Sequence, residues 1–172
     1  QQSGRFQLGY TPSDKTSVQF SVDFQQFEGE NYMNEYMDLQ PPFGDGKPYT
    51  LGEDAPQFTQ KDNLGAALTI EHEMENGFTL TSITGARNDK FSMQMDPDNT
   101  PLPIFAFESD IESDLFTQEF RISSPVEDRF NYVTGLYYIT QENSSQRHFT
   151  PGAVILAGLS QGFQMPIEAF MP

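Results

Sequence analysis

Carboxylate side chains recur at every second position between residues 108 and 114. In an extended backbone, Glu108, Asp110, Glu112 and Asp114 would project from one face, because side chains of a strand alternate between its two faces. Carboxylate oxygens are the ligands that Ca²⁺ and Mg²⁺ prefer, so Glu108, Asp110 and Glu112 are candidate ligands of a divalent cation. A solvated extension of a strand explains the same pattern without a metal, and we favour that interpretation.

Other residues that could do chemistry lack the partners that a metal centre or an active site requires. The run DPDN, from Asp96 to Asn99, has the acidic start of a calcium loop but not its glycine and closing glutamate, and therefore predicts a turn. His72 and His148 are the only histidines, and neither has further ligands at metal-binding spacing. Without a glycine-flanked nucleophile or a phosphate loop, we expect no enzyme, no catalytic residue and no cofactor.

Aromatic side chains are dense between residues 30 and 62. Tyr32 and Tyr36, like Met33 and Met37, are four residues apart, which predicts a short amphipathic helix. Aromatic rings supply large contact areas for a ligand. The candidate ligand-binding residues are Tyr32, Tyr36, Phe43, Tyr49 and Phe58. The same side chains could instead pack the loop onto itself, and both interpretations stay open.

Composition restricts the possible partners of this chain of 172 residues. Its net charge is -16, with nine Lys and Arg residues in total, which argues against nucleic acid as a partner because phosphates require clustered cations. The absence of cysteine excludes disulfides and thiolate metal sites. No apolar run reaches the roughly 20 residues of a membrane helix, but strands that cross a bilayer are apolar only at alternate positions and escape this test.

Three hairpins separated by long connections are predicted, and the dipeptide Asn76-Gly77 marks the clearest turn. The hairpins cover about residues 4–29, 63–96 and 113–143. The long connections, expected to be extracellular loops, cover about residues 30–62, 97–112 and 144–172. Short turns that alternate with long loops are typical of a membrane barrel. The predicted fold is therefore all-β, an antiparallel meander of about six long strands that forms a segment of a transmembrane β-barrel.

The expected strands can be given one apolar face each. Its members are Val18, Phe20, Val22, Phe24, Leu64, Leu68, Ile70, Phe116, Phe120 and Ile122. The strand after Phe78 is ambiguous, because Leu80 and Ile83 have opposite parity, and the strand around Tyr137 and Tyr138 is apolar on both faces. Six strands cannot close a membrane barrel, for which about eight is the minimum, so we expect the chain to be a fragment.

Three phrases follow one another along the chain: LTSITGAR at residues 80–87, FTQEFRISSP at 116–125 and FNYVTGLYY at 130–138. In this order they resemble the early barrel strands of TonB-dependent outer-membrane receptors. Ala86 departs from the pattern, in which an aromatic residue is common at this position. The resemblance implies a 22-stranded barrel closed by an N-terminal plug. The plug, the TonB-contacting segment and the later strands are expected to lie outside this chain.

The resemblance also implies a function and a location. A receptor of this family sits in the bacterial outer membrane and imports a scarce nutrient, such as siderophore-bound iron, cobalamin or an oligosaccharide, with energy delivered through TonB. Expected partners are the lipid bilayer with its lipopolysaccharide, the TonB complex through the missing parts, and a small-molecule or oligosaccharide ligand. Two alternatives stay open, a secreted or surface β-sandwich that binds glycans or mediates adhesion, and a passive porin.

Overall fold

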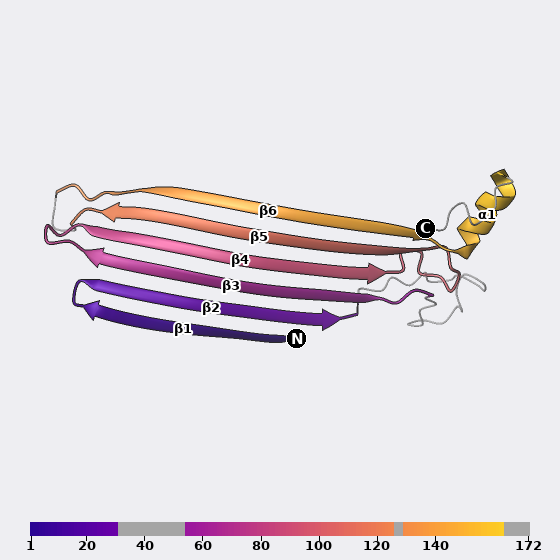
Figure 1. Ribbon diagram of the computed structural model, residues 1–172, viewed down its shortest axis with the longest axis horizontal. Coiled ribbons are helices and arrows are strands. Elements are labelled where there is room, and N and C mark those ends of the chain that lie inside the picture. The colour runs from indigo at the N-terminus through magenta and orange to yellow at the C-terminus, as the bar shows by residue number, and fades with distance from the viewer. Residues whose placement is uncertain (31–53, 126–128, 164–172) are drawn as a thin grey trace. The chain divides into compact units, whose positions relative to one another are not determined.

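The computed structural model describes residues 1–30, 54–125 and 129–163, and within them the chain is built almost entirely of strands (Figure 1). The elements are β1 (Gln2–Ser13), β2 (Thr16–Gly29), β3 (Phe58–Glu73), β4 (Thr79–Met95), β5 (Phe105–Ser123), β6 (Val133–Pro151) and α1 (Ala153–Phe163). The strands form one antiparallel sheet in the order β1-β2-β3-β4-β5-β6. This confirms the predicted all-β meander of six strands.

The chain divides into two compact units. We call residues 1–27, 61–90 and 111–144 the sheet unit, and residues 28–60, 91–110 and 145–172 the loop unit. Strands β2 to β6 contribute residues to both units. Each unit is described by itself below.

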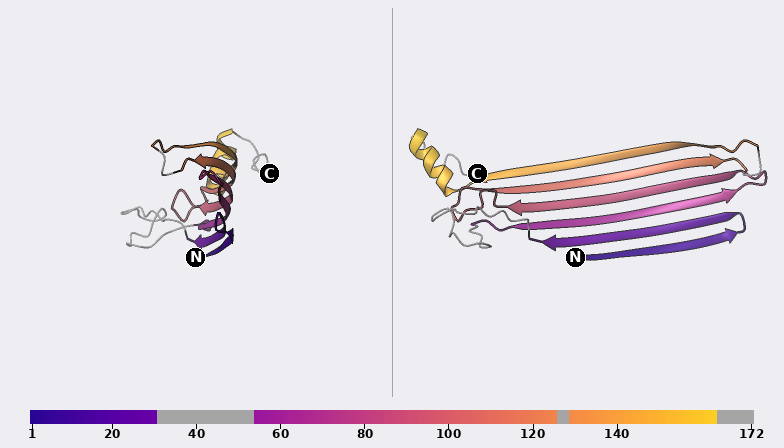
Figure 2. Two further views of the ribbon diagram at one scale, coloured as in Figure 1. Left: turned by 90° about the vertical axis from the view of Figure 1, so that its left-hand side faces the viewer. Right: turned by 180° about the vertical axis from the view of Figure 1, so that it is seen from behind.

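The hairpin turns of the sheet unit all lie at one end of its strands, as the views from the front and from behind agree (Figures 1 and 2). The backbone N–H of Glu73 donates to the carbonyl of Lys15 at 2.8 Å, which joins the first turn to the second hairpin. In the second turn, Gly77 has a φ of 81°, a left-handed conformation that favours glycine. The prediction that the turns share one rim is confirmed for the described residues, whereas Asp128 lies outside them.

Side-chain parity is the same on all strands of the sheet unit. The register pairs Phe6 with Val22 and Leu8 with Phe20, so even-numbered side chains of β1 and β2 share a face. Contacts between Thr16 and His72 on one face, and between Arg87 and Asp23 on the other, carry this parity across the next strands. We call the two surfaces the even face and the odd face. The ten residues predicted to form one apolar surface all have even numbers and lie on the even face.

The even face carries large apolar side chains that remain exposed. In strands β1 to β5 of the sheet unit, every exposed large apolar side chain is even-numbered except Ile111. The ambiguous fourth strand follows the rule, with Leu80 on the even face and Ile83 on the odd face. Strand β6 differs, because Tyr137 on the odd face and Tyr138 on the even face are both about 60% exposed (61% and 59%). Apolar surface of this extent in a soluble monomer would be exceptional.

The odd face is tied together by an arginine that reaches across a whole strand. Arg87 on β4 donates from Nη2 to both carboxylate oxygens of Asp23 on β2, at 2.8 and 3.1 Å. Gly65 on the intervening strand β3 makes this possible, because a Cβ there would lie 2.5 Å from Nη2 of Arg87 and 3.0 Å from Oδ1 of Asp23. Asp89 adds a second carboxylate 3.9 Å from Nη1 of Arg87 and accepts a hydrogen bond from Asn63 at 2.8 Å.

The loop unit has a small apolar centre of its own. Among the described residues, Leu156 of α1 is the large apolar side chain that is buried, with 7% exposure. The rings of Phe107 and Phe149 have centroids 4.7 Å apart. At Gly152 the backbone passes so close to the carbonyl of Pro103 that a Cβ would clash, and the Gly152 N–H donates to Ile104 at 2.6 Å.

Two expectations about the ends of the elements were wrong. Strands β5 and β6 extend to Phe105 and Pro151, beyond the expected limits near 113 and 143. In β5 the added residues alternate, with Phe105, Phe107 and Ile111 opposite acidic side chains, as the strand extension favoured for residues 108–114 predicts. The added residues of β6 are mostly polar on both faces, so no apolar alternation indicates the strand there. Residues 153–163, expected to be an irregular tail, form helix α1. Residues 153–159 of this segment are apolar on every side of the helix, so they show no helical periodicity that would predict it.

Replacing Gly65 by alanine should break the Arg87–Asp23 bridge and destabilise the sheet by about 1 kcal/mol, the upper range for a partly exposed ion pair. The obstructed atoms belong to the flexible end of Arg87, so the backbone should stay in place. Chemical unfolding would measure the loss.

Gly9 provides a matched control, since a Cβ there meets nothing within 4 Å and Gly9→Ala should be close to neutral. In an Arg87→Ala background, Gly65→Ala should cost no more than Gly9→Ala. Equal stability of the two single alanine variants would contradict the bridge.

Candidate functional site

A shallow hollow on the odd face gathers the polar groups of the sheet unit. It has a volume of about 270 Å³ and lies over strands β1 to β5. Arg5, Asp23 and Arg87 supply its charges, and Ser21 and Thr117 supply hydroxyl groups. The hollow depends on residues without large side chains, since a Cβ at Gly85 would meet Oγ1 of Thr117 at 2.7 Å.

Within this hollow, the two arginines have different roles. Arg87 is held by Asp23, with both side chains about one third exposed (38% and 30%). Arg5 lies directly opposite Asp23 in the register of β1 and β2, but the structure gives its guanidinium no hydrogen bond or ion pair with any described residue. Arg5 therefore keeps its donors available for an anionic or polar group above the sheet.

The loop unit brings together three carboxylates. One oxygen each of Asp54, Asp96 and Asp98 lies within 4.8 Å of the others. Backbone N–H groups of Asp54, Asp98 and Asn99 donate to Asp96 at 3.3, 3.1 and 3.2 Å. These three carboxylates are the described residues best placed to hold a cation, because hard divalent ions prefer oxygen ligands.

Asp96 is almost completely buried, with 1% exposure. The pKa of Asp96 is raised to about 6, mainly by burial and also by the negative charge of Asp98, against the opposing effect of the three backbone donors. Asp96 therefore loses its proton near pH 6, where most carboxyl groups are already ionised. A cation would compete with that proton, and would bind more readily once Asp96 is charged.

The residues proposed from the sequence fall in several places. Tyr32, Tyr36, Phe43 and Tyr49 lie outside the described residues, and Phe58, 38% exposed, begins β3. The acidic candidates Glu108, Asp110 and Glu112 lie along β5, which confirms their extended backbone. In the described part of the chain, the clustered carboxylates are a different set, Asp54, Asp96 and Asp98.

The turn predicted at the DPDN run is present, since the backbone bends there with a φ of 53° at Asn99. Two contacts of these sites were not predicted from the sequence, namely the one between Asp54 and Asp96 and the one between Arg87 and Asp23. Asp54 is 42 positions before Asp96, so no local spacing could have linked the two residues. The Arg87–Asp23 bridge spans 64 positions and left only the glycine at position 65 as an indirect signal.

Comparisons with protein-family models and with curated proteins find no match. Within the described residues, no helix has the length and apolar character needed to cross a membrane.

The carboxyl group of Asp96 should titrate with a midpoint near pH 6 in carbon-detected NMR. Since its usual pKa is 3.8, the folded loop unit holds this proton between about pH 4 and pH 6 and the unfolded chain does not. Stability from this group is therefore greatest below pH 4 and is lost as the pH rises to 6. Asp98→Asn should lower the midpoint, whereas Asp110→Asn should leave it unchanged. A midpoint near 4 in the unaltered protein would contradict the assignment.

Proposed function

We propose that this chain forms part of the barrel wall of a TonB-dependent outer-membrane transporter for a scarce nutrient. One observation carries the proposal: a single six-stranded meander with its turns on one rim and an exposed apolar face opposite a polar face. The three phrases that resemble this receptor family lie in β4, in β5 and in the segment that enters β6. In this arrangement the even face contacts lipid and the odd face lines the interior.

Polar side chains on the even face are compatible with a lipid environment, because their hydrogen-bond donors and acceptors pair with one another. The amide oxygen of Gln118 accepts from Thr84 at 2.7 Å, and its nitrogen donates to Ser82 at 3.1 Å and to the carbonyl of Glu119 at 3.2 Å. An amide left unpaired in hydrocarbon would cost several kcal/mol. Gln118 can therefore sit among Phe116 and Phe120 without requiring water.

Aromatic side chains at the turn end of the even face fit the boundary of a bilayer. The rings of Phe78 and Tyr132 have centroids 6.3 Å apart in an edge-to-face arrangement. Phe130, two residues before Tyr132 in the chain, is 84% exposed. Aromatic girdles of this kind flank the apolar band of membrane barrels.

The alternative of a glycan-binding β-sandwich finds less support. A sandwich packs two sheets face to face and buries the apolar side chains of both. The described strands all belong to one sheet, and its apolar side chains are exposed. A passive porin would share the wall and differs by its open interior, so energy-dependent uptake separates that candidate from the transporter.

Phe20→Arg should hinder insertion into the outer membrane by about 2–4 kcal/mol if Phe20 lies near the middle of the bilayer. Gln19→Arg, on the odd face of the same strand, should be tolerated. Heat-modifiable gel mobility and membrane fractionation would measure assembly. Equal damage from both substitutions would favour a sandwich that is packed on both faces.

The aromatic residues predicted for ligand capture lie outside the described residues, but the proposal makes a definite prediction for them. Simultaneous replacement of Tyr32, Tyr36 and Tyr49 by alanine should weaken ligand binding to whole cells and leave barrel assembly intact. Uptake by the unaltered protein should also stop when the inner-membrane proton gradient is dissipated. Uptake that continues without the gradient would instead identify a passive pore.

A further inference from the structure

A shallow groove crosses the odd face of the sheet unit from β1 to β5. The hollow described above, of about 270 Å³, forms its larger part. A second hollow, of about 160 Å³, shares Ser21 and Ala67 with the first and reaches Gln7 and Gln19. Four spacings between neighbouring strands make the groove about 19 Å long. Its floor is low because it is built from one small residue on each of four strands: Ser21, Ala67, Gly85 and Thr117.

Polar side chains beside the groove have hydrogen-bonding groups to spare. In the described part of the chain, the side chains of Arg5, Gln7 and Gln19 have no hydrogen-bond or ion-pair partner. Asp23 accepts two bonds from Arg87, but a carboxylate offers about four lone-pair positions. The groove therefore presents donors and acceptors together. A sugar hydroxyl group needs both, because it donates one hydrogen bond and accepts others.

An exposed aromatic ring stands at the β6 end of the groove. Gln141 on β6 donates to Ser113 on β5 at 3.1 Å, and in this antiparallel register Tyr137 lies beside Thr117. A ring contact between the same two strands on the even face supports this register. Tyr137 is 61% exposed and has no ring contact with another described residue. Its free face can pack against the C–H groups on one side of a sugar ring.

Charge favours a neutral ligand over an anionic one. The charged side chains nearest the groove are two arginines and two aspartates: Arg5, Arg87, Asp23 and Asp89. Their formal charges cancel. Nearer the turns, Arg121 pairs with Glu119 at 3.1 Å and is also attracted by Glu71. An anion attracted by Arg5 would therefore also meet the carboxylate of Asp23, which is opposite Arg5 in the register of β1 and β2.

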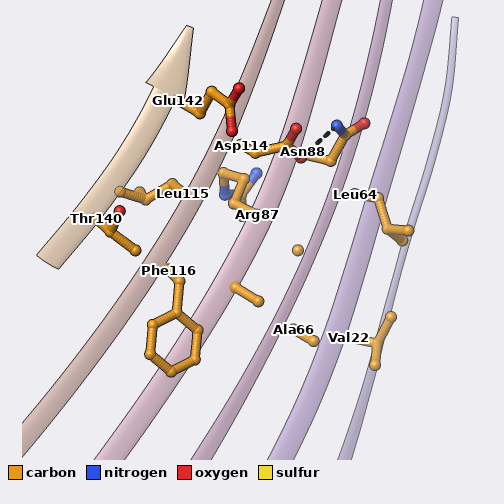
Figure 3. A pocket seen from close by; sticks show the side chains of 12 residues that line it. Val22, Leu64, Ala66, Arg87, Asn88, Asp114, Leu115, Phe116, Thr140 and Glu142 are labelled. Atoms are coloured by element: carbon orange, nitrogen blue, oxygen red, sulfur yellow. Dashed lines mark hydrogen bonds between the residues drawn. The ribbon is translucent and has the colours of Figure 1, made fainter.

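The groove lies toward the end of the strands that is away from the turns. Arg87 and Leu115 border it, and the residues next to them in the chain, Asn88 and Asp114, share a hydrogen bond of 2.8 Å (Figure 3). These two polar residues mark the end of the apolar band on the even face. In the proposed function this end of the strands is the outer one. A ligand that arrives from outside the cell therefore reaches this level of the wall before the half near the turns.

We propose that this groove binds a neutral oligosaccharide on the inner wall of the transporter. Tyr137 packs against one sugar ring at the β6 end. Toward β1, the amides of Gln7 and Gln19 and the guanidinium of Arg5 form hydrogen bonds with hydroxyl groups of the sugar. The floor of small residues lets the rings lie across the strands. This inference rests on the proposed function, because it selects one substrate class among those that such a transporter imports.

Saturation-transfer NMR and titration calorimetry can test the groove on the full-length protein that contains these strands, purified in a detergent without a sugar head group. The probes are maltotetraose, cellotetraose, mannotetraose, galactotetraose and xylotetraose, with ferric citrate as the anionic comparison. At least one tetrasaccharide should bind about tenfold more tightly than ferric citrate. Tyr137→Ala should weaken its binding about fivefold and Arg5→Ala about tenfold, whereas Tyr137→Phe keeps the ring and should preserve binding. Ala67→Leu should block binding by filling the floor.

Matched controls remove the same chemical groups from the opposite face. Tyr138→Ala and Gln26→Ala change even-numbered side chains of β6 and β2 and should leave binding unchanged. Arg5 and Tyr137 are both exposed, so their variants should assemble. Binding of none of the five tetrasaccharides, tighter binding of ferric citrate, or equal losses in the control variants would overturn the proposal. A protein that inserts and imports an iron chelate but binds no saccharide refutes only this inference, whereas a protein that never inserts refutes the proposed function.

Discussion

Arg87 can reach Asp23 only because the strand between them offers glycine at position 65. The contact joins β4 to β2 across β3, so it fixes the position of three strands at once on the odd face. It also keeps a guanidinium and two carboxylates satisfied above the sheet, since Asp89 lies 3.9 Å from the same arginine. A polar face held in this way needs no apolar partner, and the apolar side chains are left to collect on the opposite surface.

The even face has the complementary problem of apolar side chains without a covering layer. In the described residues, Leu156 of the loop unit is the buried large apolar side chain, whereas Phe6, Leu8 and Leu64 of the sheet unit each expose more than half of their surface (58%, 56% and 55%). A sheet gains most of its stability by burying one face. The missing burial therefore has to come from outside the described residues, and in the proposed function a lipid bilayer would supply it over the whole face.

The sequence was sufficient for the features that depend on local patterns. Asn76-Gly77 marked a turn, and the alternation in β2 and β3 assigned the same apolar face that the structure has. The cluster of three carboxylates was not predicted, because the contact between Asp54 and Asp96 joins distant parts of the chain. Helix α1 was not predicted, because residues 153–159 are apolar on every side and show no helical periodicity. The end of β6 was not predicted either, because side chains that are polar on both faces look the same in a strand and in a loop, whereas the acidic alternation of residues 108–114 did predict an extended backbone at the start of β5.

Even-numbered side chains stay on the same face beyond the apolar band. Along β3, β4 and β5, this face therefore changes from apolar to polar. The change occurs between Leu64 and Asp62, between Ala86 and Asn88, and between Phe116 and Asp114. The hydrogen bond from Asn88 to Asp114 shows that two of these transitions are neighbours. From Asn88 back to Phe78, near the turn, the chain spans ten residues, or about 33 Å of strand. A strand tilted by roughly 40° would then cover an apolar band about 25 Å tall, the height found in membrane barrels, so the boundary lies where a bilayer of ordinary thickness would end.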